Sequence, residues 1–126
     1  MEGRTLTLAP ERFAVCRLAS DAPIPPLPLG GSLVALTITP DELSVVMPEA
    51  FAPPDARTEG GWRALRVAGP LDFSLTGVLS ALIAPLAQAG VSIFAISTYD
   101  TDYVLVREAT LATALETLRD AGYIIV

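Results

Sequence analysis

Two polar segments carry the side chains that could bind a small charged ligand. Residues 97–102 read STYDTD between two apolar runs, and residues 69–77 read GPLDFSLTG. A hairpin needs only two to five turn residues, usually glycine, asparagine or aspartate, so the first segment carries more polar chemistry than a turn requires. Asp72 and Asp102 can accept hydrogen bonds from an ammonium or guanidinium group, and Asp100 is a further candidate. The residue types therefore predict a site for a cation.

The segment at 69–77 also leads into a predicted helix. Apolar residues recur at helical spacing from Val78 to Leu86, Ser74 or Thr76 can cap the start, and Gly90 can end the helix. The unpaired N–H groups and the positive dipole end of a helix N-terminus favour a carboxylate or phosphate. An anion site beside a cation site is what a zwitterionic amino acid requires.

An alternative interpretation gives these residues structural roles only. Asp72 would then complement the helix dipole, and Asp100 would be a turn residue. The loop and the hairpin each follow a strand of the same predicted sheet. We expect two successive halves, or two subunits, to be needed to close a pocket over both.

The elements that must position these segments follow the order strand, helix, strand, strand, helix, strand in the second half of the chain. This is the order of the ferredoxin-like fold, in which both helices cover one face of a four-stranded antiparallel sheet. The strands are predicted at 62–68, 91–97, 103–106 and 123–126, and the helical stripes at 78–86 and 111–118, the second ended by Gly122.

The first half reads as strands without a convincing helix. Four prolines in residues 21–31 exclude a regular helix or central strand there, and residues 50–61, AFAPPDARTEGG, form the clearest boundary. We therefore divide the chain into residues 1–60 and 61–126, the first part being either a degenerate copy of the second or an extension of its sheet. Its strands are predicted at 5–9, 12–18, 32–39 and 43–47, the last two joined as a hairpin by PDEL.

The composition excludes several classes of function. The chain has 126 residues, is 52% hydrophobic, carries a net charge of −6 and contains neither histidine nor lysine. All its basic residues are arginines that occur singly, which argues against nucleic acid as a partner. An enzyme would have to use carboxylates and hydroxyls alone, so we expect no catalytic activity, no cofactor and no metal.

The location of the protein is also predicted from composition. No apolar run reaches the ~18 residues that a membrane span needs, so no membrane partner is expected. The start of the chain, Met1 to Arg4, does not resemble a secretory signal, and we expect a cytoplasmic protein. The single cysteine, Cys16, excludes an internal disulfide and is interpreted as a small core residue.

Residues 69–106, GPLDFSLTGVLSALIAPLAQAGVSIFAISTYDTDYVLV, closely resemble the ACT domain family of amino-acid-binding regulatory modules, especially the CASTOR-type cytosolic arginine sensors. Residues 39–49, TPDELSVVMPE, are similar to the segment through which the first ACT unit of that subgroup contributes to its ligand interface. The similarity covers residues 31–126. It implies an α+β fold, in which a ferredoxin-like βαββαβ ACT unit follows a degenerate, mostly β ACT-like half, with a small ligand held between ACT units.

The resemblance also implies a set of ligand-binding residues. They are Ser44 and Val45, which would offer hydroxyl and backbone contacts; Thr76 and Gly77, which would hold the ligand carboxylate; and Thr98, Tyr99 and Asp102, which would line the remainder. Asp102 would be the anionic anchor. Asp72 completes the predicted set because of its own charge.

These observations predict a small regulatory ACT protein that binds a free amino acid at an interface between ACT units and forms a homodimer. Arginine or lysine would suit the acidic residues, whereas an aspartate that binds the α-ammonium group would accept neutral amino acids equally well. The alternative is a structural or interaction protein that kept the scaffold without the ligand. The arginine sensors carry four ACT units and this chain has room for two at most, so their signalling role is not expected to transfer.

Overall fold

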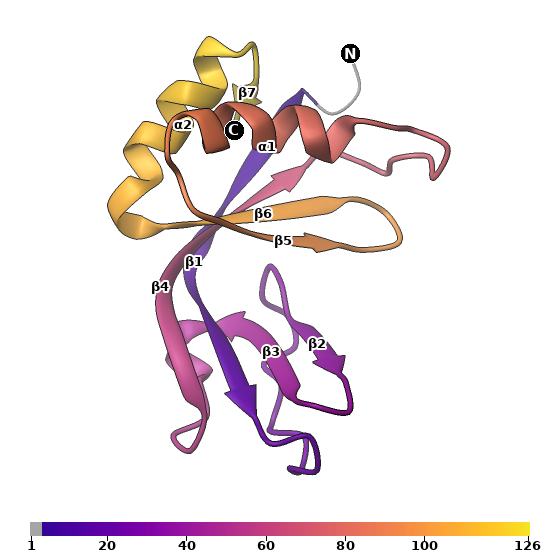
Figure 1. Cartoon of the computed structure of the whole chain (residues 1–126), viewed down its shortest axis with the longest axis vertical. Coiled ribbons are helices and arrows are strands. Elements are labelled where there is room, and N and C mark those ends of the chain that lie inside the picture. The colour runs from indigo at the N-terminus through magenta and orange to yellow at the C-terminus, as the bar shows by residue number, and fades with distance from the viewer. Residues whose placement is uncertain (1–3) are drawn as a thin grey trace. The chain divides into compact units, whose positions relative to one another are not determined.

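The computed structural model describes residues 4–126 and divides the chain into two compact units. The first unit comprises the residues up to Pro10 together with Arg63–Val126, and therefore contains most of the second half of the chain. The second unit comprises Glu11–Trp62. The expectation that the chain does not start with a secretory signal concerned Met1 to Arg4, and residues 1–3 lie outside the described residues. Two long strands, β1 (Thr5–Leu18) and β4 (Arg57–Val67), contribute residues to both units (Figure 1).

The first unit has the predicted βαββαβ order. After β4 come α1 (Val78–Gln88), β5 (Ile93–Ser97), β6 (Asp102–Arg107), the short 3-10 helix η2 (Glu108–Thr110), α2 (Leu111–Asp120) and β7 (Ile124–Ile125). The strands of this unit are hydrogen-bonded in the order β1-β4-β6-β5, and β7 pairs with β1. The predicted α+β, ferredoxin-like fold class is confirmed.

The sheet of the first unit contains one strand more than predicted. The four-stranded antiparallel sheet expected for this unit gains the start of β1, which pairs with β4 and also, in parallel, with β7. The backbone N–H of Ala68 donates to the carbonyl of Thr5 at 2.8 Å, and that of Val126 donates to Leu6 at 2.8 Å. Leu6 is fully buried in the core of this unit, so burial of apolar surface favours the added strand.

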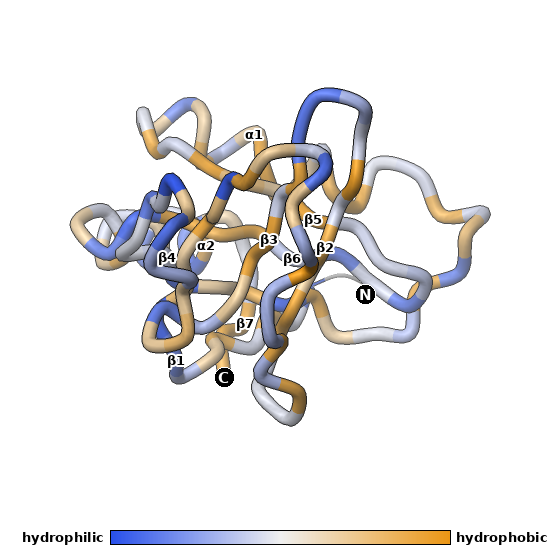
Figure 2. The backbone as a smooth tube through the Cα atoms, turned by 90° about the horizontal axis from the view of Figure 1, so that it is seen from below, coloured by the Kyte–Doolittle hydropathy of each residue, from blue (hydrophilic) through white to orange (hydrophobic). Residues whose placement is uncertain are grey.

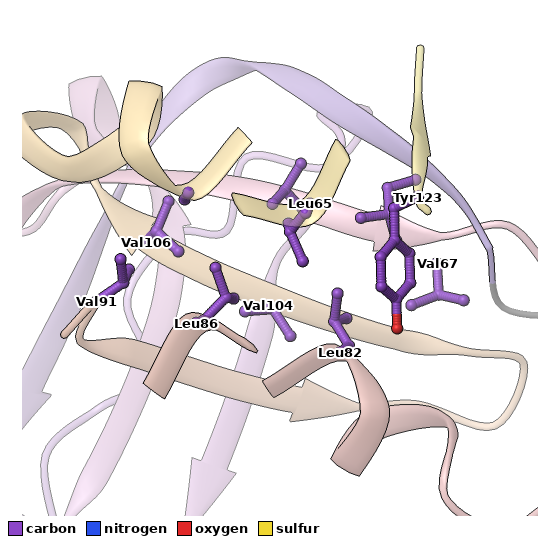
Figure 3. Close-up of a cluster of buried hydrophobic side chains, with 11 residues drawn as sticks. Leu65, Val67, Leu82, Leu86, Val91, Val104, Val106 and Tyr123 are labelled. Carbon is purple, nitrogen blue, oxygen red and sulfur yellow. The ribbon is translucent and has the colours of Figure 1, made fainter. Parts of the chain in front are cut away.

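Both helices cover the same side of this sheet. Leu82 and Leu86 of α1 are fully buried in one cluster with Val67 of β4 and Val104 of β6 (Figure 3). Leu118 of α2 is fully buried in the same cluster. Full burial of one such leucine side chain stabilises the fold by about 2 kcal/mol. Figure 2 shows hydrophobic residues along the strands and helices of the chain. Within residues 4–126, no helix is long and apolar enough to cross a membrane.

The ends of α1 agree only in part with the sequence prediction. Gly90 follows the helix with a φ of 74°, and the N–H of Val91 donates back to the carbonyl of Leu86 at 2.9 Å, which confirms the predicted stop. The cap at the start is Gly77, with a φ of 76°, and neither Ser74 nor Thr76. The chain enters the helix through a left-handed residue, a conformation that glycine adopts without a steric penalty.

The second unit is built from strands, and its described residues contain no α-helix. Its strands are hydrogen-bonded in the order β2-β3-β1-β4, and β2 and β3 form the predicted antiparallel hairpin. The unit adds β2 (Ala35–Ile38), β3 (Leu43–Pro48) and the 3-10 helix η1 (Glu49–Phe51) to its parts of β1 and β4. Its core includes the buried side chains of Leu18, Leu43, Val45 and Met47. The proline-rich segment has no regular structure, as predicted.

β1 is one strand where two short strands were predicted around Pro10. β7 pairs with Thr5 and Leu6, whereas β3 pairs with Phe13 to Leu18, so Pro10 lies in the interval between these two partners. A proline cannot donate a ladder hydrogen bond, but its fixed φ is compatible with extended backbone. The proline therefore does not end the strand.

β4 begins earlier than predicted, because Arg57–Gly61 is strand instead of boundary loop. Glu49 accepts a hydrogen bond from the backbone N–H of Gly61 at 2.8 Å and lies 3.7 Å from Nε of Arg12. Gly61 has a φ of 75°, a value typical of a glycine in a β-bulge. These contacts continue the strand through the glycine pair.

Candidate functional site

The two polar segments line one open cavity in the first unit. The β4–α1 loop (residues 68–77) forms one side with the start of α1, and the β5–β6 hairpin forms the other. The cavity has a volume of about 320 Å³, which is at the lower end of the range for small-molecule sites. It is lined by Leu71, Asp72, Phe73, Leu75, Gly77, Val78, Leu79, Ser80, Ser97, Thr98, Tyr99, Asp100, Thr101 and Asp102.

Short hydrogen bonds hold the hairpin against the loop. The backbone N–H of Leu71 donates to the carbonyl of Asp100 at 2.7 Å, and the hydroxyl of Thr101 donates to the carbonyl of Val67 at 2.7 Å. Gly69 permits the close approach, since a Cβ at this position would lie 3.1 Å from the carbonyl oxygen of Asp100. The two segments thus lie side by side within one unit, whereas the expectation that a second half or subunit closes the pocket over both stays a prediction. β6 pairs with β4, so the turn before β6 lies beside the end of β4.

Two threonines account for part of the polar content of the hairpin. The backbone N–H of Thr98 donates to the carbonyl of Thr101 at 2.8 Å, and the hydroxyl of Thr98 contacts the same oxygen at 3.1 Å. The register pairs Ser97 with Asp102, which leaves four residues in the turn. Thr98 and Thr101 therefore close the turn, while Tyr99 and Asp100 are exposed at its tip.

Three carboxylates give the cavity a negative charge. Asp102 accepts a hydrogen bond from the hydroxyl of Ser97 at 2.6 Å, and Asp72 accepts one from the backbone N–H of Ser74 at 2.8 Å. The hydrogen bond from the Ser74 backbone lowers the pKa of Asp72 below its ordinary value, so this side chain is ionised at neutral pH. Asp100 is the third carboxylate, and among residues 4–126 no arginine lines the cavity. This charge favours a cationic group.

The start of α1 supplies the opposite preference. The first hydrogen bond that the cap residue accepts within the helix joins the N–H of Ala81 to the carbonyl of Gly77 at 2.9 Å. The N–H groups of Val78 to Ser80 precede it and have no partner within the helix. Such a helix start binds a carboxylate well. One cavity therefore offers an anion-binding end and a cation-binding side.

Two aromatic rings meet at this cavity. Phe73 of the loop and Tyr99 of the hairpin have ring centroids 4.8 Å apart and planes at 79°, an edge-to-face contact. Phe73 is 74% exposed and Tyr99 is 80% exposed. The loop and the hairpin are thus joined by an aromatic contact as well as by hydrogen bonds.

The structure places five of the predicted site residues around the cavity. They are Asp72, Gly77, Thr98, Tyr99 and Asp102. Thr76 is exposed next to Gly77 and is not part of the lining. Ser44 and Val45 belong to β3 in the second unit, where the Val45 side chain is fully buried and the strand pairs with β1 and β2.

The sequence prediction did not name Phe73, Ser80 or Ser97 as site residues. Phe73 had a signal, because an aromatic side chain in a connecting loop often packs in the core or contacts a ligand. The roles of Ser80 and Ser97 depend on the position of α1 and on the β5–β6 register, which the sequence alone did not define.

A second cavity lies in the second unit. Its volume is about 640 Å³, and it is bounded by the proline-rich segment 22–28 and by residues 51–55. Asp55 is the one charged side chain in its lining. Prolines and aliphatic residues dominate this cavity, and they offer little chemistry for recognising a charged ligand.

Comparison with known protein families supports the resemblance found in the sequence. A family model described as an ACT domain matches residues 57–120, and a second model, described as an N-terminal domain, matches residues 11–55. The first match covers half of the chain. The second falls within the mostly β unit.

Similar proteins include a named sensor and structures of related fold. The bovine protein named cytosolic arginine sensor for mTORC1 subunit 1 is 34% identical over 95 residues, which are 67% of this chain and 29% of that protein. A crystal structure from Agobacterium tumefaciens superposes with a TM-score of 0.89 at 34% identity, covering 97% of this chain and 91% of that one. The regulatory subunit of aspartate kinase from Thermus thermophilus, in a ligand-free form, has a TM-score of 0.60 at 13% identity, covering 90% and 96%, and shows the fold alone.

Proposed function

The chain belongs to the ACT domain family, and from this premise we propose that it is a regulatory module that binds a free amino acid in the cavity between the β4–α1 loop and the β5–β6 hairpin. The observation that carries the proposal is the pairing of a helix start with three aspartates around one cavity. The α-carboxylate would lie at the N–H groups that begin α1. The ammonium group, or a cationic side chain, would lie against Asp72 and Asp102.

Arginine and lysine are the preferred candidates for the ligand. The cavity lining carries three aspartates, and an amino acid with a second positive charge complements them better than a neutral one. The bovine relative is named as an arginine sensor. Since this chain spans 29% of that protein, only the ligand class is proposed here, without the downstream partner.

The ligand is proposed to lie at an interface between ACT units, and a homodimer is one way to supply the second unit. The rings of Phe73 and Tyr99 are exposed, so the cavity has an apolar rim that a second unit would cover. Ser44 and Val45 remain in the proposal through the family resemblance. A regulatory role without catalysis and a cytoplasmic location agree with the names of the relatives.

The test is a thermal-shift screen of the full chain with each of the twenty amino acids at millimolar concentration. A ligand at a hundredfold excess over its Kd stabilises the folded state by about 2.7 kcal/mol, which raises Tm by roughly 10 °C for a domain of this size. Asp102→Asn should abolish the shift, whereas Asp120→Asn, at the exposed end of α2, should retain it. No shift with any amino acid would remove the support for binding.

A second candidate is a structural or interaction protein that has no ligand. Its supporting observation is that the polar groups of the hairpin already have partners, such as Ser97 with Asp102 and Thr101 with Val67. In that case Asp102→Asn should lower the free energy of unfolding, and neither wild type nor the variant should bind an amino acid. Chemical denaturation of the variant beside wild type distinguishes the two functions.

A further inference from the structure

A covering second unit would bury Phe73, but it does not explain why this rim position carries an aromatic ring. A large apolar side chain that is 74% exposed contributes little to folding, and Phe73 is not among the residues of the hydrophobic core. It is nevertheless held in place by its edge-to-face contact with Tyr99, at a centroid distance of 4.8 Å. Both rings line the cavity, one from each of its sides.

Each ring is next to an aspartate in the sequence. Asp72 precedes Phe73, Asp100 follows Tyr99, and both carboxylates also line the cavity. An edge-to-face pair leaves ring faces free, and the face of an aromatic ring attracts a cation. The cavity thus combines aromatic faces with anionic hydrogen-bond acceptors.

A planar cation can use both features at once. A guanidinium group stacks on a ring through its face and donates hydrogen bonds to carboxylates from its edge. An ammonium group is compact and strongly hydrated, so it can pair with a carboxylate but cannot stack. The arrangement of rings and carboxylates therefore discriminates between the two groups.

We infer that Phe73 is a specificity-determining residue, which forms with Tyr99 an aromatic clasp for a planar cationic group of the ligand. The inference rests on the proposed function, because it concerns the ligand of the same cavity. The clasp favours guanidinium over ammonium and leaves the α-carboxylate of the ligand to the start of α1.

The test measures the affinities of arginine and lysine by titration calorimetry for the full chain and three variants. Phe73→Leu keeps an apolar side chain and removes the ring, Phe73→Tyr keeps the ring, and Leu75→Ala shortens another apolar lining residue of the loop. In Phe73→Leu, arginine should bind about fivefold more weakly, and the ratio of arginine to lysine affinity should fall by roughly threefold. Phe73→Tyr and Leu75→Ala should keep the wild-type ratio.

Tm without ligand controls for a structural role. It should be the same in wild type and Phe73→Tyr, and the loss of one exposed ring contact in Phe73→Leu should lower it by only a few degrees. An unchanged affinity ratio in Phe73→Leu overturns the inference, and so does an equal fall in Leu75→Ala. If wild type binds a neutral amino acid but neither arginine nor lysine, the proposed function stands and the clasp is wrong. If wild type binds no amino acid, the proposed function fails and the clasp fails with it.

Discussion

Thr101 is the buried polar residue of the β5–β6 hairpin, with 4% of its surface exposed. Its hydroxyl donates to the carbonyl of Val67 at the end of β4, and its backbone N–H contacts the hydroxyl of Thr98 at 3.3 Å. Tyr99 and Asp100, at the tip of the same turn, are exposed. Within this short motif, Thr98 and Thr101 therefore stabilise the hairpin, whereas Tyr99 and Asp100 are accessible to a ligand.

Replacing Thr101 with valine should separate these roles. Valine keeps the shape of threonine, but the carbonyl of Val67 loses the hydrogen bond from the Thr101 hydroxyl. We expect Thr101→Val to lower the free energy of unfolding by about 1–3 kcal/mol in urea denaturation. Thr7→Val, at an exposed position of β1, is the matched control and should change it by less than about 0.5 kcal/mol. Equal stabilities for the two variants would contradict the role given to the Thr101 hydroxyl.

At the scale of elements, the cavity depends on how closely the β4–α1 loop approaches the hairpin. Gly69 lies at the closest point, where an added Cβ would be 3.1 Å from the Asp100 carbonyl oxygen and 3.2 Å from the Leu71 nitrogen. These are the two groups that join the loop to the hairpin by a 2.7 Å hydrogen bond. The shape of the cavity is therefore sensitive to a single methyl group.

Gly69→Ala should weaken amino-acid binding, because the methyl group pushes the loop away from the hairpin. We expect a loss of about tenfold in affinity, measured by calorimetry with the ligand found for wild type. Gly90→Ala is the control, since its φ of 74° strains an alanine while the site around it is open. That variant should lose about 1 kcal/mol of stability and keep its affinity for the ligand. The reverse pattern would show that the loop contact does not shape the site.

The helices and most strands of the chain were predictable because their signals are local. The apolar spacing from Val78 to Leu86 and the stop at Gly90 lie within a few turns of each other, and so do the signals for the β2–β3 hairpin. The pairing of β1 with β7 joins residues from opposite ends of the chain, and no local pattern specifies it. The closeness of the two polar segments followed from the neighbouring positions of β4 and β6, which the βαββαβ order implies. The charge of the site was predictable, but the aromatic contact of Phe73 with Tyr99 depends on loop conformation.

At the scale of the whole molecule, two strands contribute residues to both compact units. β1 contributes residues up to Pro10 to the first unit and the remainder to the second, and β4 crosses the division between Trp62 and Arg63. Unfolding of β1 or β4 in one unit therefore removes strand residues from the other unit as well. A chain of this size with shared strands is expected to unfold in one cooperative step.

Denaturation followed by two probes can check this cooperativity. Trp62 is the only tryptophan, 6% exposed at the end of the second unit, and its fluorescence reports there, whereas α1 and α2 dominate the far-ultraviolet dichroism and belong to the first unit. Both signals should give the same urea midpoint and slope.

Leu43→Ala, in the core of the second unit, removes a fully buried side chain and should lower the free energy of unfolding by about 2–5 kcal/mol. Because the strands are shared, this variant should shift the helix signal as much as the tryptophan signal, and Leu118→Ala in α2 should do the same from the other unit. A helix signal that keeps its wild-type midpoint in Leu43→Ala would show instead that the two units unfold as separate domains.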